Sequence, residues 1–187
     1  MGEICSKIGS GSTPRGSEYY GSGIPFFRSQ NVYNEGLDYK DIVYISKSTH
    51  DKMKATFVFP NDLLLNITGG SLGRCAVVPK DFEVGNVSQH VCIIRPVRTN
   101  TTYLHICILS DLFQQNIKTS GAGRQGLPKY NLEKMCFPLP PLKEQEEIVN
   151  KVETLLTKVT TLETQIQDRK SLSDKLIFGI IKENLEG

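Results

Sequence analysis

The feature that most constrains this chain is a proline-rich stretch that leads without a loop into a long helical pattern. Residues 138–162 read PLPPLKEQEEIVNKVETLLTKVTTL. Proline lacks an N–H group and fixes φ, so the prolines of this stretch end any regular ladder of hydrogen bonds. No proline occurs after Pro141, and we expect a helix to begin at Lys143. The sequence therefore predicts a globular head, residues 1–142, followed by a C-terminal helix, residues 143–187.

Apolar residues recur along the C-terminal helix at alternating steps of four and three, which is the spacing of a coiled-coil seam. Arg169 and Ser173 interrupt this seam. A helix from Lys143 to Asn184 would be roughly 60 Å long at about 1.5 Å per residue, longer than such a head is wide. The pattern favours pairing with another helix, with folding back onto the head as the alternative. The apolar residues of the expected dimerisation seam are Ile148, Val152, Leu155, Val159, Leu162, Ile166, Leu176 and Ile180.

Short β-type runs separated by glycine, proline and polar turns fill the head, which is typical of a β-rich fold. The clearest helix inside the head is expected at residues 103–117, and a shorter one at residues 49–54. We therefore expect an α+β fold, in which a mixed, β-rich globular domain is followed by one long C-terminal coiled-coil helix. The runs expected to form strands are residues 24–28, 42–46, 56–59, 63–68, 74–78 and 91–97.

The net charge of +2 is unevenly divided between the two regions. Residues 143–187 carry 7 Lys and Arg against 9 Asp and Glu, a net of −2. Subtraction from the totals of 22 and 20 leaves 15 against 11 in residues 1–142, a net of +4. The head is mildly basic and the helix mildly acidic, a division that favours a head facing nucleic acid.

Motifs for catalysis and for cofactor binding are absent from the sequence. It contains no G-x-x-x-x-G-K-[ST] nucleotide-binding loop, no G-x-S-x-G and no H-E-x-x-H. Five scattered cysteines without a C-x-x-C pair predict reduced thiols in a cytoplasmic protein, with no metal or cofactor site. No apolar run is long enough to cross a membrane. We expect a binding protein and not an enzyme.

Three polar, glycine-rich stretches are the candidate DNA-reading loops: residues 13–31, 68–74 and 119–131. Arginine, glutamine and asparagine match the two-pronged edges of guanine and adenine, and glycine lets backbone N–H groups approach a phosphate. A plain solvated loop is the alternative for each stretch. His90, next to Gln89 at a strand start, is interpreted as structural, with a DNA-reading role as the alternative. The candidate DNA-binding residues are Arg15, Arg28, Ser29, Gln30, Asn31, Thr68, Arg74, Arg124, Gln125 and Lys129.

Together these stretches resemble the specificity (S) subunit of type I restriction–modification systems. The resemblance rests on GSGSTPRGSEYYGSGIPFFRSQNV, LLLNITGGSLGRCAVVP, VSQHVCIIRP and, most specifically, NLEKMCFPLPPLKEQEEIVNKVETLL. It implies a target recognition domain at residues 1–142 and a spacer helix at residues 143–187. It also implies double-stranded DNA and modification (methyltransferase) subunits as partners, a restriction subunit reached through the complex, and no catalysis in this chain.

A full S subunit of this family has two recognition domains and two antiparallel helices, whereas this sequence holds one of each. The resemblance therefore implies either a fragment or a half-subunit that forms a homodimer and reads a palindromic, interrupted site. Two other classes are the alternatives: a protein-binding module with a dimerising coiled-coil stalk, and a fragment of a DNA methyltransferase or nuclease. Weak salt dependence of binding would favour the first. Activity with S-adenosylmethionine or Mg²⁺ would favour the second.

Overall fold

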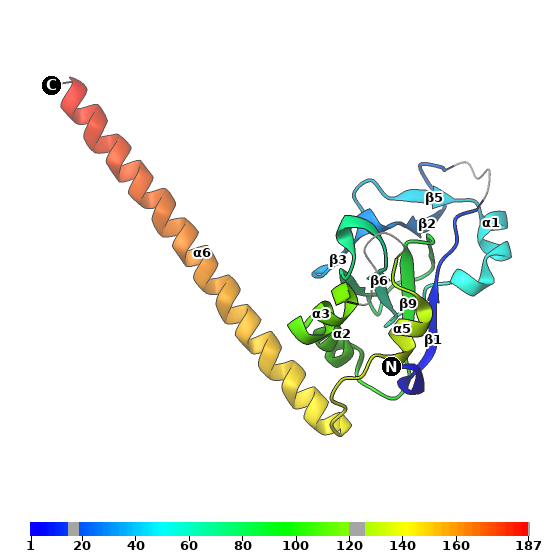
Figure 1. Cartoon of the computed structure of the whole chain (residues 1–187). Helices are drawn as coiled ribbons and strands as arrows, with labels where there is room; N and C mark the ends of the chain where they lie inside the picture. Colours follow the sequence, from blue (N-terminus) through cyan, green and yellow to red (C-terminus); the bar gives the residue numbers. More distant parts are fainter. Residues whose placement is uncertain (15–18, 120–125, 187) are drawn as a thin grey trace. The chain divides into compact units, whose positions relative to one another are not determined.

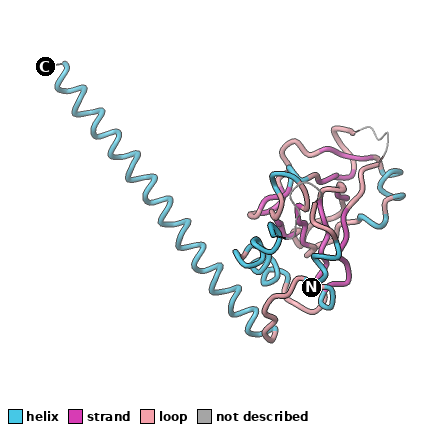
Figure 2. Tube along the Cα trace, viewed as in Figure 1, coloured by secondary structure: helices cyan, strands magenta, loops and turns pink. Residues whose placement is uncertain are grey.

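The chain divides into two compact units, Met1–Glu146 and Glu147–Gly187. The computed structural model describes residues 1–14, 19–119 and 126–186, with side chains described except at 118–119 and 179–186. Strands and short helices make up the first unit, which we call the head from here on, and one helix makes up the second (Figures 1 and 2). The prediction of an α+β fold with a long C-terminal helix is confirmed.

A four-stranded antiparallel sheet forms the centre of the head. Its strands are β1 (Cys5–Ser10), β9 (Val91–Pro96), β6 (Leu63–Asn66) and β7 (Cys75–Val77), in the order β1-β9-β6-β7. The two central strands, β9 and β6, consist of buried residues over most of their length. Continuous apolar runs such as these suit strands that are covered on both faces.

A second, smaller sheet packs beside the first and completes the β-rich part of the head. It has the order β5-β2-β8, in which β2 (Ile24–Phe27) pairs antiparallel with β5 (Val43–Ile45) and parallel with β8 (Asn86–Val87). A two-stranded hairpin, β3 (Val32–Tyr33) and β4 (Gly36–Leu37), follows β2. One apolar cluster joins Phe27 and Val87 of this sheet to alternate residues of β6 and β9.

Three short helices cover the other face of the central sheet. They are α2 (Thr101–Leu109), α3 (Asp111–Thr119) and α5 (Lys129–Lys134). Another short helix, α1 (Lys47–Lys52), follows β5 (Figure 1). In the described ranges, 3-10 turns lie at Gly2–Ile4, Ser29–Asn31, Lys54–Thr56 and Gly69–Ser71. The side chains that form one core with the central sheet are Leu104, Ile108, Phe113, Ile117 and Leu132.

Most predicted strands are found, and the exceptions have local causes. The runs 24–28, 42–46, 63–68, 74–78 and 91–97 correspond to β2, β5, β6, β7 and β9. The prediction of a strand at 56–59 is wrong, because a 3-10 turn occupies Lys54–Thr56 and Phe57 forms only an isolated bridge with Asn86. The sequence also missed β1, β3, β4 and β8, three of which are only two residues long.

Both predicted head helices differ from the observed ones at serine residues. The helix expected at 103–117 is two helices, because Ser110 adopts extended backbone angles and its hydroxyl accepts from the Phe113 N–H at 3.4 Å. The helix expected at 49–54 begins earlier. Its N-cap is Ser46, whose hydroxyl accepts from the Thr49 N–H at 3.1 Å. Serine side chains commonly cap helices in this way, so each serine marks a helix start.

The long helix α6 spans Leu142–Glu186, 45 residues, or roughly 68 Å at about 1.5 Å per residue. Its first turn belongs to the head, since the buried Gln145 side chain accepts from the Asn100 N–H at 2.8 Å and donates to the Pro140 carbonyl at 2.8 Å. Among the described helices, α6 included, none combines the length and apolar content needed to cross a membrane.

Candidate nucleic-acid interface

The first two candidate loops leave the central sheet at one of its two ends. β1 ends at Ser10 and β6 ends at Asn66, while β7 begins at Cys75 and β9 begins at Val91. The register pairs Ser10 with Cys92, Asn66 with Val91 and Leu65 with Cys75, so these four strand ends lie side by side. We call this part of the head the loop end and define it by residues 11–14, 67–74, 88–90 and 126–127.

The first candidate loop is anchored at the loop end through the two residues that precede it, Gly11 and Ser12. The Gly11 N–H donates to the Val91 carbonyl at 2.9 Å, and the Ser12 N–H donates to the Val87 carbonyl at 3.2 Å. A Cβ at position 11 would lie 2.0 Å from the Val87 carbonyl oxygen, a distance that no side chain tolerates. Gly11 therefore lets the chain pass directly over the turn between β8 and β9.

The third candidate loop returns to the same place. The Leu127 N–H donates to the Ile67 carbonyl at 2.8 Å. Gly126 has φ +83°, and a Cβ there would lie 2.7 Å from Cγ2 of Thr68. A positive φ favours glycine over other residues. The described end of the third candidate loop therefore meets the second at Thr68, and the chain enters the first loop at the same end of the sheet. Arg15, Arg124 and Gln125 fall outside the described residues.

Asn31 is a correction to the sequence-based prediction. Its side chain is fully buried, and its amide donates to the carbonyls of Asp38 at 3.1 Å and Lys40 at 3.3 Å. Its Oδ1 atom accepts from the Arg28 N–H at 3.1 Å. These bonds fix the turn that follows β2, so Asn31 supports the head and has no group left for a base edge.

The neighbours of Asn31 are placed differently from one another. Arg28 is half-buried, and its guanidinium donates to the Asp41 carbonyl at 3.1 Å. Ser29 is also half-buried, and its carbonyl accepts from the Asn66 amide at 2.8 Å. Gln30 lies at the exposed tip of the turn. The Ser29–Asn66 bond ties this turn to the end of β6, so Gln30 is held beside the loop end.

Arg74 is exposed just before β7. Its guanidinium carbon lies 4.9 Å from the centre of the Tyr33 ring, a cation–π contact that orients the group and leaves its N–H edge available. Among the described residues, the ion pairs within 4.0 Å involve other cations. Arg74 is thus a positive charge presented at the loop end, suited to a phosphate.

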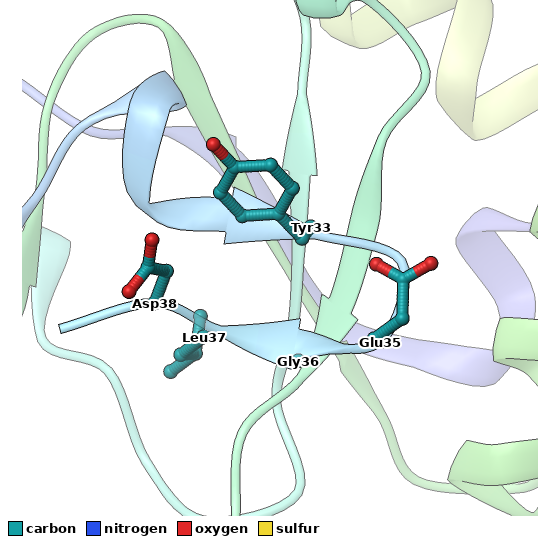
Figure 3. A pocket seen from close by; sticks show the side chains of 5 residues that line it. All are labelled: Tyr33, Glu35, Gly36, Leu37 and Asp38. Carbon is teal, nitrogen blue, oxygen red and sulfur yellow. The ribbon is translucent and has the colours of Figure 1, made fainter. Parts of the chain in front are cut away.

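A hollow beside Arg74 is unsuited to DNA. Tyr33, Glu35, Gly36, Leu37 and Asp38 of the β3–β4 hairpin line it. Figure 3 shows the two carboxylates projecting from the hairpin on either side of the Tyr33 ring. Two carboxylates would repel a phosphate backbone, so the candidate interface is the loop end and not this hollow.

Lys129 stands at the first position of α5, next to the third candidate loop. Its ammonium lies 3.3 Å from the Glu133 carboxylate, and both side chains are exposed. Exposed pairs at this spacing contribute only about 0.3–0.5 kcal/mol. The contact is weak enough for Lys129 to exchange it for a phosphate.

Other charged and polar side chains are used inside the head. Arg95 binds the buried Asp62 through two bonds, Nε to Oδ1 at 2.7 Å and a terminal nitrogen to Oδ2 at 2.8 Å. His50 is buried, stacks on Phe57 with ring centres 4.0 Å apart and bonds to Asn86. These residues stabilise the head and are not candidates for DNA contact.

The thiols and imidazoles of the described head do not form a metal site. Within the described ranges, no three His, Cys, Asp or Glu side chains are grouped so that they could hold an ion. Burial raises the pKa of Cys92 to about 12 and that of Cys5 to about 11. These thiols stay protonated near neutral pH and are poor nucleophiles and ligands.

His90 was interpreted as structural, yet its imidazole is exposed at the loop end. Its Nδ1 atom lies 2.8 Å from the Thr68 hydroxyl oxygen, so the ring is both oriented and accessible. The signal in the sequence was the polar pair Gln89–His90 directly before a buried strand, a position where side chains project from a sheet end.

Comparison with known proteins identifies relatives. A family model described as the type I restriction modification DNA specificity domain matches residues 1–169. The specificity subunit of the type I restriction enzyme EcoBI from Escherichia coli is 28% identical over 169 residues, which are 88% of this chain and 35% of that protein. The EcoKI specificity subunit from Escherichia coli strain K12 is 23% identical over 150 residues, 77% of this chain and 32% of that protein. This chain spans about a third of the length of these curated relatives.

Two solved structures share the fold. The HsdS subunit from Thermoanaerobacter tengcongensis aligns with a TM-score of 0.63 at 22% identity, over 87% of this chain and 37% of that chain. A chain from a structure of the type I R-M system, determined for its complex assembly and conformational transition, gives a TM-score of 0.68 at 21% identity, over 86% of this chain and 38% of that chain. Because the family model also covers the head and most of α6, this chain belongs to the family of type I restriction–modification DNA specificity subunits, with one target recognition domain and one long helix.

Proposed function

We propose that this chain is a DNA-reading specificity subunit, or half of one, that directs methylation and cleavage by partner subunits. In this proposal the head recognises double-stranded DNA in the cytoplasm, and modification subunits and a restriction subunit supply the catalysis. The chain itself does no chemistry and needs no cofactor. The single observation that carries the proposal is that the described ends of the three polar loops lie at one end of the sheet in a chain of this family.

The division of labour at the loop end follows from chemistry. Arg74 and Lys129 are exposed cations and would contact phosphates, which fix position but carry no sequence information. Gln30 and Thr68, with Arg28 and Ser29 behind them, would lie closer to base edges. Arg15, Arg124 and Gln125 belong to the same proposal from their loop context alone.

The exposed seam of α6 supports a pairing role. Leu155, Leu162 and Ile166 are 49%, 57% and 66% exposed. Apolar side chains aligned along one stripe favour burial against another helix, each contributing roughly 1.5–3 kcal/mol when fully buried. We propose that Ile148 to Ile180 form a seam with a second copy or with the missing second half of a longer subunit, though the side chain of Ile180 lies outside the described part.

The threonines of α6 strengthen the argument for a partner. Threonine is a weak helix former because its branched side chain loses rotamer freedom. The hydroxyls that bond back to the carbonyl four residues earlier, at 2.7–3.1 Å, belong to Thr154, Thr157, Thr160, Thr161 and Thr164. Such bonds do not raise helix stability. A helix with this composition depends on packing rather than on intrinsic propensity.

Two heads joined by paired helices would read a bipartite site. A symmetric homodimer presents the same loop end twice, so its DNA site would be palindromic with an unread interval between the half-sites. A longer subunit with two different heads would instead read an asymmetric bipartite site. The alternative function, a protein-binding module with a dimerising stalk, would not depend on phosphate contacts.

The proposed function is tested by the salt dependence of DNA binding. Affinity for a random-sequence duplex, measured by fluorescence anisotropy, should fall steeply between about 50 and 200 mM salt. Lysine and arginine side chains that contact phosphates release counterions from the DNA, and this release becomes less favourable as the salt concentration rises. The Arg74→Ala variant should weaken binding to all sequences alike and reduce the salt slope by about 1.

Lys80 offers a matched control for Arg74. It is exposed just after β7, at the opposite end of the same strand, so Lys80→Ala should leave affinity and slope unchanged. Equal loss in the two variants would mean a general charge effect. DNA binding that ignores salt would reject the proposal and favour the protein-binding module.

A further inference from the structure

Gln89, His90 and Thr68 form a chain of polar side chains at the loop end. His90 Nδ1 lies 2.8 Å from Thr68 Oγ1, and His90 Nε2 lies 3.4 Å from Gln89 Nε2. The Ile67 N–H also donates to the His90 carbonyl at 3.0 Å, which fixes the backbone. Gln89 and His90 are exposed. Ordering exposed side chains costs conformational entropy, and exposed hydrogen bonds return little stability. The stability of the head therefore does not explain why these side chains are held in place.

Proton positions along this chain determine which groups of Gln89 stay free. His90 Nε2 lies against the amide nitrogen of Gln89 and accepts from its N–H, so the proton of the neutral imidazole is on Nδ1 and is donated to the Thr68 hydroxyl oxygen. The oxygen Oε1 and the second N–H of the Gln89 amide are left free.

An amide fixed in this orientation matches one purine edge. Adenine presents an N6–H₂ donor beside an N7 acceptor in the major groove, and glutamine meets both at once. Gln89 Oε1 would accept from N6–H, and the second N–H of its amide would donate to N7. Guanine presents two acceptors at this edge, O6 and N7, and would face Oε1 with an acceptor.

We propose that Gln89 reads an adenine in the major groove, with Thr68 and His90 as positioning residues that hold its amide in the adenine-selective orientation. The inference rests on the proposed DNA-reading function and deepens it. It moves base recognition to the turn before β9, whereas the sequence pattern had placed it in the three glycine-rich stretches. Thr68, which the sequence had predicted as a DNA-binding residue, would act through His90 and Gln89 and would not contact the base itself.

The test is selection of bound duplexes from a pool with a random central stretch, followed by sequencing. The purified chain should enrich a site with adenine strongly preferred at one position of each half-site. Gln89→Ala should flatten preference at that position by roughly 5- to 150-fold, the range of one good bidentate contact. Affinity for a random-sequence duplex should stay within about twofold, because phosphate contacts are untouched.

Thr68 supplies a matched pair of variants for the positioning role. Thr68→Ser keeps the hydroxyl and should keep the adenine preference. Thr68→Val keeps the shape, removes the hydroxyl oxygen that accepts from His90 Nδ1–H, and should relax the same position that Gln89→Ala flattens. Urea midpoints for both should equal that of the parent chain, which separates a loss of selectivity from a loss of folding.

The outcomes separate this inference from the function it rests on. A parent chain that selects no sequence and binds without salt dependence would reject both proposals. A parent chain that selects a site, with Gln89→Ala selecting it equally well, would overturn only the adenine reading. Uniform weakening of Gln89→Ala toward every sequence would also overturn it, because it would assign Gln89 to the phosphate backbone.

Discussion

The head and the C-terminal helix differ in which of their side chains are buried and which are exposed. In the head, apolar side chains close into a core, and polar groups such as Asp62 and Asn31 are bonded internally. In α6, the apolar seam lies open from Leu155 to Leu176, with Leu155 at 49% and Leu162 at 57% exposure. The head therefore offers polar loops to a partner, whereas the helix offers an apolar stripe. One surface suits DNA, and the other suits a second helix.

The largest effect is expected when charged residues replace apolar residues of the seam, because this tests whether the exposed seam binds a second helix. Leu155→Glu combined with Leu162→Glu should convert a pair of chains into monomers of 20.9 kDa in light scattering. Each chain of a dimer loses two buried leucines, so the dimer loses on the order of 6–12 kcal/mol at roughly 1.5–3 kcal/mol per leucine. The head should unfold at the same urea concentration as before.

Threonines on the other face of α6 provide the control. Thr157 and Thr164 lie about 160–180° around the helix from Ile166, at 100° per residue. Thr157→Glu combined with Thr164→Glu adds the same charge without touching the seam and should preserve the mass of the pair. A parent chain that is already monomeric, or equal dissociation by both double variants, would contradict the assignment of the seam.

The second largest effect should come from breaking the head while leaving the helix intact. Asp62→Ala removes a fully buried carboxylate from Arg95, whose side chain is only 26% exposed. Removing one partner of such a pair costs about 3–5 kcal/mol, and we expect the lower end because Arg95 reaches water. All seven tyrosines lie before residue 143, so tyrosine fluorescence in urea reports on the head alone.

An exposed ion pair in the same head calibrates this result. Lys47 and Asp51 lie 3.4 Å apart on α1, with side chains 82% and 53% exposed. Asp51→Ala should cost no more than about 0.5 kcal/mol. Asp62→Ala could instead lower the free energy of unfolding as little as Asp51→Ala does. The Asp62–Arg95 pair would then not stabilise the head, and internal polar bonds would not be what distinguishes the head from the helix.

The sequence predicted the helix better than the head because the two regions encode structure at different ranges. The seam of α6 repeats over many residues, and a proline marks its start, so local periodicity sufficed. β3, β4 and β8 are only two residues long, too short to show a period of their own. β8 exists through pairing with the distant strand β2, whereas β3 and β4 pair with each other across a turn. The split at Ser110 depended on one hydroxyl acting as a cap, a choice that helix periodicity does not reveal.

The candidate site was predicted in part for the same reason. Glycine-rich polar stretches can be recognised locally, and the described ends of three of them lie at the loop end. What the sequence could not supply was the direction of each side chain. Asn31 turned inward to bond the chain of its own turn, while His90 turned outward beside Thr68. Side-chain direction was decided by individual hydrogen bonds, within its own turn for Asn31 and to Thr68 of another loop for His90, which the sequence pattern does not reveal.

The smallest expected effect is a dependence of the stability of the head on pH, which the helix α6 should not share. His105 Nε2–H donates to the Cys75 carbonyl at 2.7 Å, and burial lowers the pKa of this imidazole below its ordinary value. The unfolded chain then binds more protons than the folded head below pH about 6.5, so the stability of the head should fall as pH drops through that value. Replacing His105 with Gln keeps an N–H donor but removes the titration. Urea unfolding followed by tyrosine fluorescence should become less pH-dependent between pH 7 and pH 5 in this variant, since α6 holds no histidine. An unchanged pH profile would assign the dependence to other groups of the head.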